Sequence, residues 1–140
     1  MPLFARVVVD TNILFSALLS PQSRFASIIL TQEADFYICE SVIIELFEHK
    51  ERLITISRLP PSELLAALHI LLRHLHLYQE RNIGKENLQR GYELCRAIDV
   101  DDALHVALTL ELDGLLWTGD KKLREGLQVQ GFNRFFVPGQ

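Results

Sequence analysis

Short apolar runs alternate along the chain with longer segments whose apolar residues recur at helical spacing. The short runs are rich in β-branched residues and predict strands, whereas the longer segments predict amphipathic or buried helices. The expected strands span residues 6–9, 36–39, 76–78, 114–117 and 134–137. The expected helices span residues 12–19, 23–31, 41–53, 62–75, 85–98, 103–112 and 121–128.

Local signals place several of these helices more closely. Ser41 is expected to cap the helix over 41–53, and Ser62, after two prolines, the helix that carries Leu65, Leu68, Leu72 and Leu75. In the next helix the spacing predicts one buried stripe, formed by the following side chains: Leu88, Tyr92 and Cys95.

Strands that alternate with helices, and that are apolar without a period of two, indicate a parallel sheet covered on both faces. We therefore expect an α/β fold, a three-layer α/β/α sandwich around a central, mainly parallel sheet of four to five strands. The chain shows no internal repeat and no interdomain linker. Residues 1–140 are expected to form a single domain.

Composition narrows the class of protein. Of the 140 residues, 49% are hydrophobic, enough for a core that needs neither disulfides nor a structural metal. Cys39 and Cys95 form no C-x-x-C motif and are expected to be buried free thiols. Neither a signal peptide nor an apolar run long enough to span a membrane is visible, so a cytoplasmic protein is expected. The net charge of −4 excludes a generally cationic binder of nucleic acid.

Acidic residues stand where strands end and helices begin. Asp10 ends the run "VVVD", Asp120 ends "GLLWTGD", and Asp102 begins the buried helix "DALHVALTL", preceded by Asp99 and Asp101. In an open parallel sheet these positions share one edge, where ligands bind. We expect Asp10, Asp102 and Asp120 to converge there.

Two interpretations of these acids remain open. Each residue precedes a helix, and an aspartate N-cap stabilises a helix by about 1 kcal/mol. A cluster of carboxylates, however, is self-repelling unless protons or cations intervene, and oxygen ligands of this kind suit Mg²⁺ or Mn²⁺. Glu45 shares a polar helix stripe with His49 and Arg52, so it is either a solvated side chain or a further ligand.

The chain resembles the PIN domains in the segments "VVVDTNILFSALL", "SVIIELF" and "DVDDALHVALTLELDGLLWTGDKKL". It is most similar to the toxin components of toxin–antitoxin systems, the relatives of VapC. The resemblance implies that Asp10, Glu45, Asp102 and Asp120 are the four catalytic acids. In these relatives an acid-rich segment precedes the third catalytic acid, and Asp99 and Asp101 match that segment. Asp99 is a further candidate metal ligand. The resemblance also implies that these polar residues flank the acids: Thr11, Asn12, Thr118 and Gly119.

What the resemblance implies is an endoribonuclease that depends on Mg²⁺ or Mn²⁺, is held inactive by a cognate antitoxin and forms a homodimer. Its substrate is RNA, and the RNA backbone contacts expected from the sequence are Lys121, Lys122 and Arg24. Thr118 is expected to hydrogen-bond Asp10 or a metal-bound water, and Gly119 to allow close approach of the backbone. Trp117 is expected in the core, and His105 is expected to be a satisfied core or rim residue.

Three other functions compete with this hypothesis. Phosphatases of the haloacid-dehalogenase type also begin with an aspartate after an apolar strand, but they place a second aspartate where this chain has Asn12. A phosphoacceptor receiver domain requires an acid pair after its first strand, which is absent here. A PIN-fold binding module without turnover retains the same acids, so the sequence alone leaves it open.

Overall fold

The sheet at the centre of the computed structural model has four parallel strands among the residues that the model describes, 4–20 and 22–139. Their order is β3-β2-β1-β4. The strands are β1 (Arg6–Val9), β2 (Asp35–Cys39), β3 (Leu75–Tyr78) and β4 (Leu115–Trp117). The helices are α1 (Thr11–Leu19), α2 (Arg24–Thr31), α3 (Glu40–Glu48), α4 (Lys50–Ser57), α5 (Pro61–Leu72), α6 (Lys85–Cys95), α7 (Ala103–Glu111) and α8 (Lys121–Val129).

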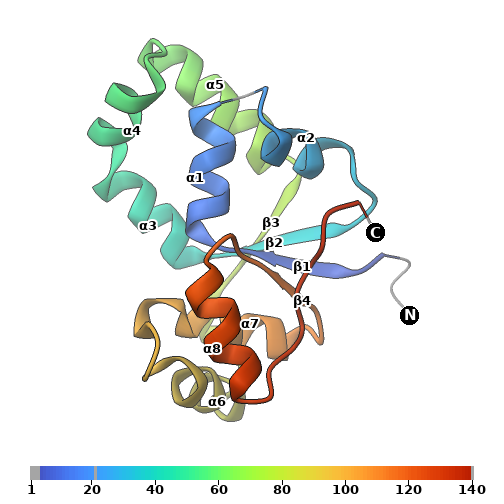
Figure 1. Ribbon diagram of the computed structural model, residues 1–140. Helices are drawn as coiled ribbons and strands as arrows, with labels where there is room; N and C mark the ends of the chain where they lie inside the picture. Colours follow the sequence, from blue (N-terminus) through green and yellow to red (C-terminus); the bar gives the residue numbers. More distant parts are fainter. Residues whose placement is uncertain (1–3, 21, 140) are drawn as a thin grey trace.

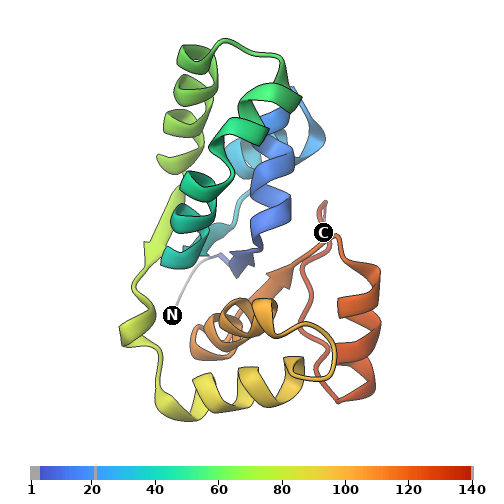
Figure 2. The ribbon, with the colours of Figure 1, turned by 90° about the vertical axis from the view of Figure 1, so that its left-hand side faces the viewer.

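The helices cover the sheet on both faces, so the expected three-layer α/β/α sandwich is confirmed. Helices α1 to α5 lie on one side of the sheet and α6 to α8 on the other (Figures 1 and 2). The middle strand β1 is the most enclosed element, because the side chains of Val7, Val8 and Val9 are fully buried. A strand that is apolar on both faces is what a sheet covered on both sides requires.

The predicted helix over 41–53 is wrong, because the segment forms two helices, α3 and α4, separated at His49. His49 leaves helical geometry with φ −108° and ψ 11°, and this residue turns the chain. Ser41 is not the cap, since α3 begins at Glu40 and the Ser41 N–H donates instead to Glu80 Oε1 at 2.8 Å. The apolar spacing continues through the break, which is why periodicity did not reveal it.

The predicted helix over 62–75 is also displaced. Helix α5 begins at Pro61, with Pro60 rather than Ser62 in the cap position, and it ends at Leu72. Leu75 belongs to β3, where it pairs with Phe36 of β2. Proline suits the first turn of a helix because its missing N–H has no partner there in any case.

Three further expectations need correction. Helix α6 ends at Cys95, and Tyr92 on its surface is 52% exposed, whereas Gly91, Leu94 and Cys95 are buried. The segment over 134–137 forms only one parallel bridge, between Phe135 and Leu116, so the predicted fifth strand is reduced to a single contact. Both cysteines are buried and free, as expected.

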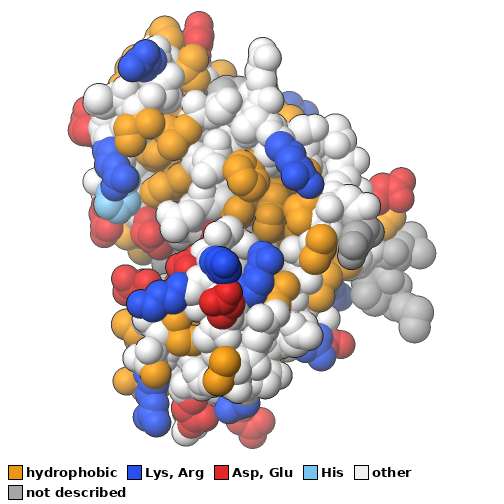
Figure 3. Space-filling model, viewed as in Figure 1, with side chains coloured by type: hydrophobic (Ala, Val, Ile, Leu, Met, Phe, Trp, Pro, Cys, Tyr) orange, Lys and Arg blue, Asp and Glu red, His pale blue; other side chains and the backbone are white. Residues whose placement is uncertain are grey.

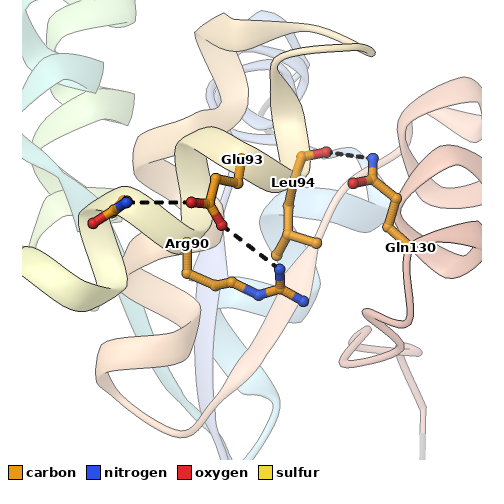
Figure 4. Close-up of polar contacts among 5 residues, drawn as sticks. Arg90, Glu93, Leu94 and Gln130 are labelled. Atoms are coloured by element: carbon orange, nitrogen blue, oxygen red, sulfur yellow. Dashed lines mark hydrogen bonds and ion pairs between the residues drawn. The ribbon is translucent and has the colours of Figure 1, made fainter.

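The helices beneath the sheet are tied to one another at their ends. Gln130, directly after α8, donates through its side-chain amide to the Leu94 carbonyl of α6 at 2.8 Å (Figure 4). On the exposed surface of α6 the Arg90–Glu93 pair at 3.9 Å contributes little by comparison (Figure 4). The hydrogen bond from Gln130 fixes the C-terminal end of α8, and the N-terminal end of the same helix carries Asp120.

Within the described residues, no single helix is both long and apolar enough to cross a membrane. The sharply bent pair α1 and α2 meets the criterion together, by length and composition only.

We predict that Gly114→Ala lowers the free energy of unfolding by about 1–3 kcal/mol, because overpacking has costs of this size. A methyl group at Gly114 would overlap the backbone carbonyl oxygen of Arg6 and push β4 away from β1. Urea denaturation measures the change. Gly119→Ala, at the other end of β4, is the matched control: its methyl group would lie 3.8 Å from Ile13 Cδ1 and should be tolerated. Equal losses for the two variants would contradict this account.

Candidate active site

The pairing of β1 with β4 brings the two strand-ending acids together. Val9 is in register with Trp117, and the Asp10 N–H continues the ladder by donating to the Trp117 carbonyl at 3.2 Å. Asp10 therefore leaves β1 beside the start of the Thr118–Asp120 turn. From β1 the chain continues to β2 and β3 on one side, and it then crosses to β4 on the other side of β1. In open α/β sheets, ligands bind at the carboxyl ends of the strands where the strand order reverses in this way.

A cavity of about 170 Å³ opens at this edge, and we call it the acidic cavity. The carboxylates expected to converge do line it, together with polar groups of α1 and α7. Its lining residues are Asp10, Thr11, Asn12, Glu45, Asp99, Asp101, Asp102, His105 and Asp120. Six of these carry carboxylates, and four elements or their flanking turns supply them.

The structure separates the two interpretations of the aspartates. The Ile13 N–H donates to Asp10 Oδ1 at 2.9 Å, and the Leu123 N–H donates to Asp120 Oδ1 at 3.0 Å, so both residues cap helices. Asp102 precedes α7 but makes no side-chain capping bond. Helix capping therefore accounts for one oxygen each of Asp10 and Asp120, and it does not account for Asp102.

Burial and mutual repulsion determine the charges in the acidic cavity. Burial first, and then the neighbouring carboxylates of Asp99, Asp10 and Asp120, together raise the pKa of Asp102 to about 7. The pKa of Asp10 is also raised, chiefly by burial, against hydrogen bonds from Thr118 and the Ile13 amide that lower it. Without a cation, Asp102 therefore retains a proton up to a higher pH than an exposed aspartate does.

Glu45 is held by a chain of hydrogen bonds that crosses the acidic cavity. The Thr11 hydroxyl donates to Glu45 Oε1 at 3.1 Å, and Thr11 Oγ1 lies 3.3 Å from His105 Nε2. Since Thr11 gives its proton to Glu45, its oxygen accepts from His105, which fixes the Nε2–H tautomer. Burial lowers the pKa of His105 to about 4, so this imidazole is neutral.

His105 differs from its expected role in its hydrogen bonding only. It is buried, as expected, but its Nδ1 has no hydrogen-bond partner among the described residues. An unpaired acceptor in the interior carries a free-energy cost. His105 is therefore a rim residue of the acidic cavity, as one of the two expected alternatives had it, but one of its ring nitrogens is unsatisfied.

Thr118 links two of the acids from beneath the acidic cavity. Its hydroxyl hydrogen-bonds Asp10 and accepts the Asp120 N–H at 3.1 Å, while the side chain is almost fully buried. Arg124 Nη2 donates to the Thr118 carbonyl at 2.9 Å and its guanidinium lies over the Phe135 ring. Arg124 therefore supports the turn that carries Asp120.

The other residues singled out from the sequence lie around this centre. Asn12 is exposed and lines the acidic cavity, whereas a methyl group at Gly119 would make an ordinary contact with Ile13 Cδ1, at 3.8 Å. Lys121 and Lys122 are exposed, and Lys121 lies 3.8 Å from Glu125. Arg24 begins α2 and does not line the acidic cavity.

Two contacts could not have been inferred from sequence motifs. One is the His105–Thr11 link, which joins residues 94 positions apart, and the other is the clamp on the start of α3. There Glu80 Oε1 accepts from the Ser41 N–H, and the Glu80 N–H donates to Glu40 Oε1, both at 2.8 Å. The clamp fixes the helix that presents Glu45. For the His105–Thr11 link, the sequence offers one signal, a histidine on a mostly apolar helix, and for the clamp it offers none.

The donor set of the acidic cavity fits a hard divalent cation. Carboxylate, hydroxyl and amide oxygens line it, and the thiol ligands of a zinc site do not. As placed, no three acidic, histidine or cysteine side chains among residues 4–20 and 22–139 stand at the spacing of a metal site. Repulsion between carboxylates favours this separation, and an ion between them would reverse it.

We predict that Asp102→Asn raises the free energy of unfolding in EDTA at pH 8 by about 1–2 kcal/mol, since solvent screens part of the repulsion. The pKa of Asp102 is about 7 in the folded state, against an ordinary value of 3.8 for aspartate. Between pH 4 and pH 7 the folded protein therefore keeps a proton on Asp102 that the unfolded chain has released. Wild-type stability falls as the pH rises through this range. The advantage of the variant should shrink toward pH 4. Urea titrations at several pH values measure it.

The matched control is Asp120→Ala, which removes the cap of α8 and is expected to lose about 1 kcal/mol of stability. If Asp102→Asn is also destabilised at pH 8, Asp102 has a structural role that the geometry does not show.

Comparisons with known proteins identify the family of the chain. The family model of the PIN domain matches residues 8–136. No curated protein matches the chain. Among solved structures, the chain is similar to PAE2754 from Pyrobaculum aerophilum, with a TM-score of 0.62 and 16% sequence identity over 87% of this chain and 79% of that one, a likeness of fold. The match over nearly the whole sequence shows that the chain belongs to the PIN domain family, whose members are typically metal-dependent nucleases.

Proposed function

We propose that the chain is an endoribonuclease that depends on Mg²⁺ or Mn²⁺. The observation that carries the proposal is the acidic cavity, in which six carboxylates meet at the carboxyl edge of the sheet. Capping explains two of them only in part and does not explain Asp102. PIN domains are generally nucleases that use divalent metals, and the donor set of the acidic cavity fits such an ion.

The residues have distinct proposed roles. Asp10, Asp102 and Asp120 hold the cation, with Asp99 as a further candidate ligand, and Glu45 orients the attacking water or adds a ligand. When bound, the ion neutralises charge on the phosphate and lowers the pKa of a bound water.

Hydrogen bonds restrict the motion of these carboxylates. The Thr11 hydroxyl fixes one oxygen of Glu45, and Thr118 holds Asp10 against the Asp120 turn. Such partners orient the ligands of a metal, and their loss typically weakens binding or activity.

Positive charge beside the acidic cavity supports RNA as the substrate. Lys121 and Lys122 directly follow Asp120, and the Lys121–Glu125 pair is so exposed that it leaves the ammonium group available. Figure 3 shows acidic and basic side chains interspersed over the start of α8. Arg24 is a third proposed contact, outside the acidic cavity. The carboxylates of the acidic cavity would hold a cation, whose charge would allow an acidic protein to bind a polyanion.

PIN domain nucleases often pair with antitoxins, and we propose that this chain is the toxin of such a pair, acts in the cytoplasm and forms a homodimer. An apolar groove of about 500 Å³ between α3, α4 and α5 supports a partner surface. Two of its lining residues, Phe47 and Leu65, are 73% and 66% exposed. Exposed apolar patches of this kind commonly mark sites of protein association.

We predict that Asp10→Asn, Asp120→Asn and Glu45→Gln each lower RNA cleavage at least a hundredfold, and that EDTA abolishes cleavage. Each substitution removes a charge that holds the ion or orients the water, while the amide retains the shape of the carboxylate. Cleavage of a labelled, structured RNA with Mn²⁺ or Mg²⁺ is the measurement.

Asp113→Asn is the control for this series, because it removes an aspartate charge that pairs with Arg134 at 2.6 Å, outside the acidic cavity. It should cleave like wild type. Unchanged cleavage in the three site variants would refute the proposal. Hydrolysis of phosphomonoesters but not RNA would indicate the phosphatase, and an absence of metal binding would indicate a module without turnover.

We predict that wild type is dimeric by light scattering and that Leu65→Glu shifts it toward monomer without changing its helical content. A buried glutamate at the apolar groove would be desolvated without a partner. Val129→Glu is the control, since Val129 is 88% exposed and lies outside this groove. A wild-type monomer at high concentration, or equal dissociation of both variants, would contradict the dimer proposal.

A further inference from the structure

A second cavity, of about 290 Å³, lies next to the acidic cavity between α1 and the α3–α4 corner. We call it the α1–α4 pocket. Asn12 and Glu45 line both cavities, so the two spaces adjoin at these residues. No residue of the α1–α4 pocket other than Glu45 belongs to the proposed catalytic set. The α1–α4 pocket therefore lies beside the proposed cleavage site, within reach of the same RNA strand.

The walls of the α1–α4 pocket combine apolar and polar groups. Leu19, Leu53 and Ile56 provide aliphatic surface. The Phe15 ring stands edge-on to the His49 imidazole, with centroids 6.0 Å apart and an interplanar angle of 74°. The break at His49, which separates α3 from α4, is what places these two rings together. A flat heterocycle fits this combination of an aromatic edge, an aliphatic wall and polar groups.

A cationic side chain also lines the α1–α4 pocket. Arg52 is exposed at its rim and, among the described residues, forms no ion pair. Figure 3 shows hydrophobic side chains between α4 and α1, with a histidine and Lys or Arg side chains along their left-hand border and acidic side chains below. A free guanidinium next to a row of carboxylates provides a contact for a phosphate.

We propose that the α1–α4 pocket binds one unpaired nucleobase of the RNA strand whose scissile phosphate lies in the acidic cavity, with Arg52 contacting an adjoining phosphate. This inference rests on the proposed function and adds to it a binding site for one base, formed by residues of this chain outside the proposed catalytic set. Bases inside an A-form duplex are stacked and paired, so they cannot enter a side pocket, whereas an unpaired base rotates out and packs against aromatic and Arg side chains.

The test measures the affinity of the protein for RNA by fluorescence anisotropy, with Ca²⁺, which also takes oxygen ligands, in place of Mg²⁺ or Mn²⁺. The probes are an eight-nucleotide single-stranded RNA, the same RNA annealed to its complement, and an abasic ribose-phosphate octamer. Wild type should bind the single strand about tenfold more tightly than either other probe, which is within the range for stacking of one base. Equal affinity for the single strand and the abasic octamer would overturn the proposal.

Ser16→Phe fills the α1–α4 pocket from α1. It should reduce affinity for the single strand to that for the abasic octamer, whose own affinity stays within twofold of wild type. Ser27→Phe, at an exposed position of α2 outside the pocket, is the matched control and should bind like wild type. Ser16→Phe that folds and still prefers the base-bearing strand overturns the proposal.

Arg52→Gln tests the phosphate contact at an exposed position where the fold is not at risk. It should weaken binding of both the single strand and the abasic octamer, and reduce the slope of log affinity against log salt by about 1. The charge-matched control Arg81→Gln lies outside the pocket and should change neither. Equal affinities for the two variants overturn the proposal, even if Ser16→Phe does not fold.

These results can be separated from failure of the proposed function. If wild type cleaves RNA and EDTA stops it, but Ser16→Phe binds and cleaves as wild type does, only the pocket proposal fails. If wild type cleaves no RNA, the nuclease proposal fails whatever the binding data show.

Discussion

Parallel pairing of β1 with β4 is the interaction on which the rest of the site depends. The strand β1 is buried on both faces, and its ladder runs one residue past Val9 to join Asp10 to Trp117. That last hydrogen bond fixes the backbone of the first acid beside the turn that carries the last acid. Strands supported on both faces hold a side chain at their end more rigidly than a loop does. The contact of Gly114 with the Arg6 backbone, at the opposite end of β4, sets the same spacing.

The acidic cavity works against the stability that this core supplies. Burial and neighbouring charge raise the pKa of Asp102 and Asp10, which means that the folded state disfavours their ionised forms. Two features offset part of this cost: Asp10 and Asp120 each accept a helix N-terminal amide, and Thr118 bonds to both residues. The same carboxylate thus caps a helix with one oxygen and leaves the other for a ligand. Capping and metal binding are compatible roles.

The sequence predicted the layers and the edge where the acids meet, because apolar strands and strand-ending aspartates are local patterns whose outcome follows from parallel topology. It did not predict the break at His49, since the apolar spacing of α3 and α4 runs through it. Nor did it predict the clamp between Glu80 and the start of α3, or the link of His105 to Thr11. These depend on contacts between residues far apart in the chain, and on which rotamers the packing allows, and neither leaves a periodic trace.

The break at His49 shows why such a departure from a local rule has consequences for function. A continuous helix would carry Glu45 and Arg52 along one straight face, as the sequence pattern suggested. The corner instead brings α4 alongside α1, so that His49 contacts Phe15 and Arg52 lines the same pocket, while Glu45 remains at the acidic cavity. The break at His49 therefore places a partly aromatic pocket with Arg52 at its rim beside the anionic cavity at the edge of the sheet. A phosphodiester strand has this same alternation, of charged links that require a cation and bases that require an aromatic or aliphatic wall.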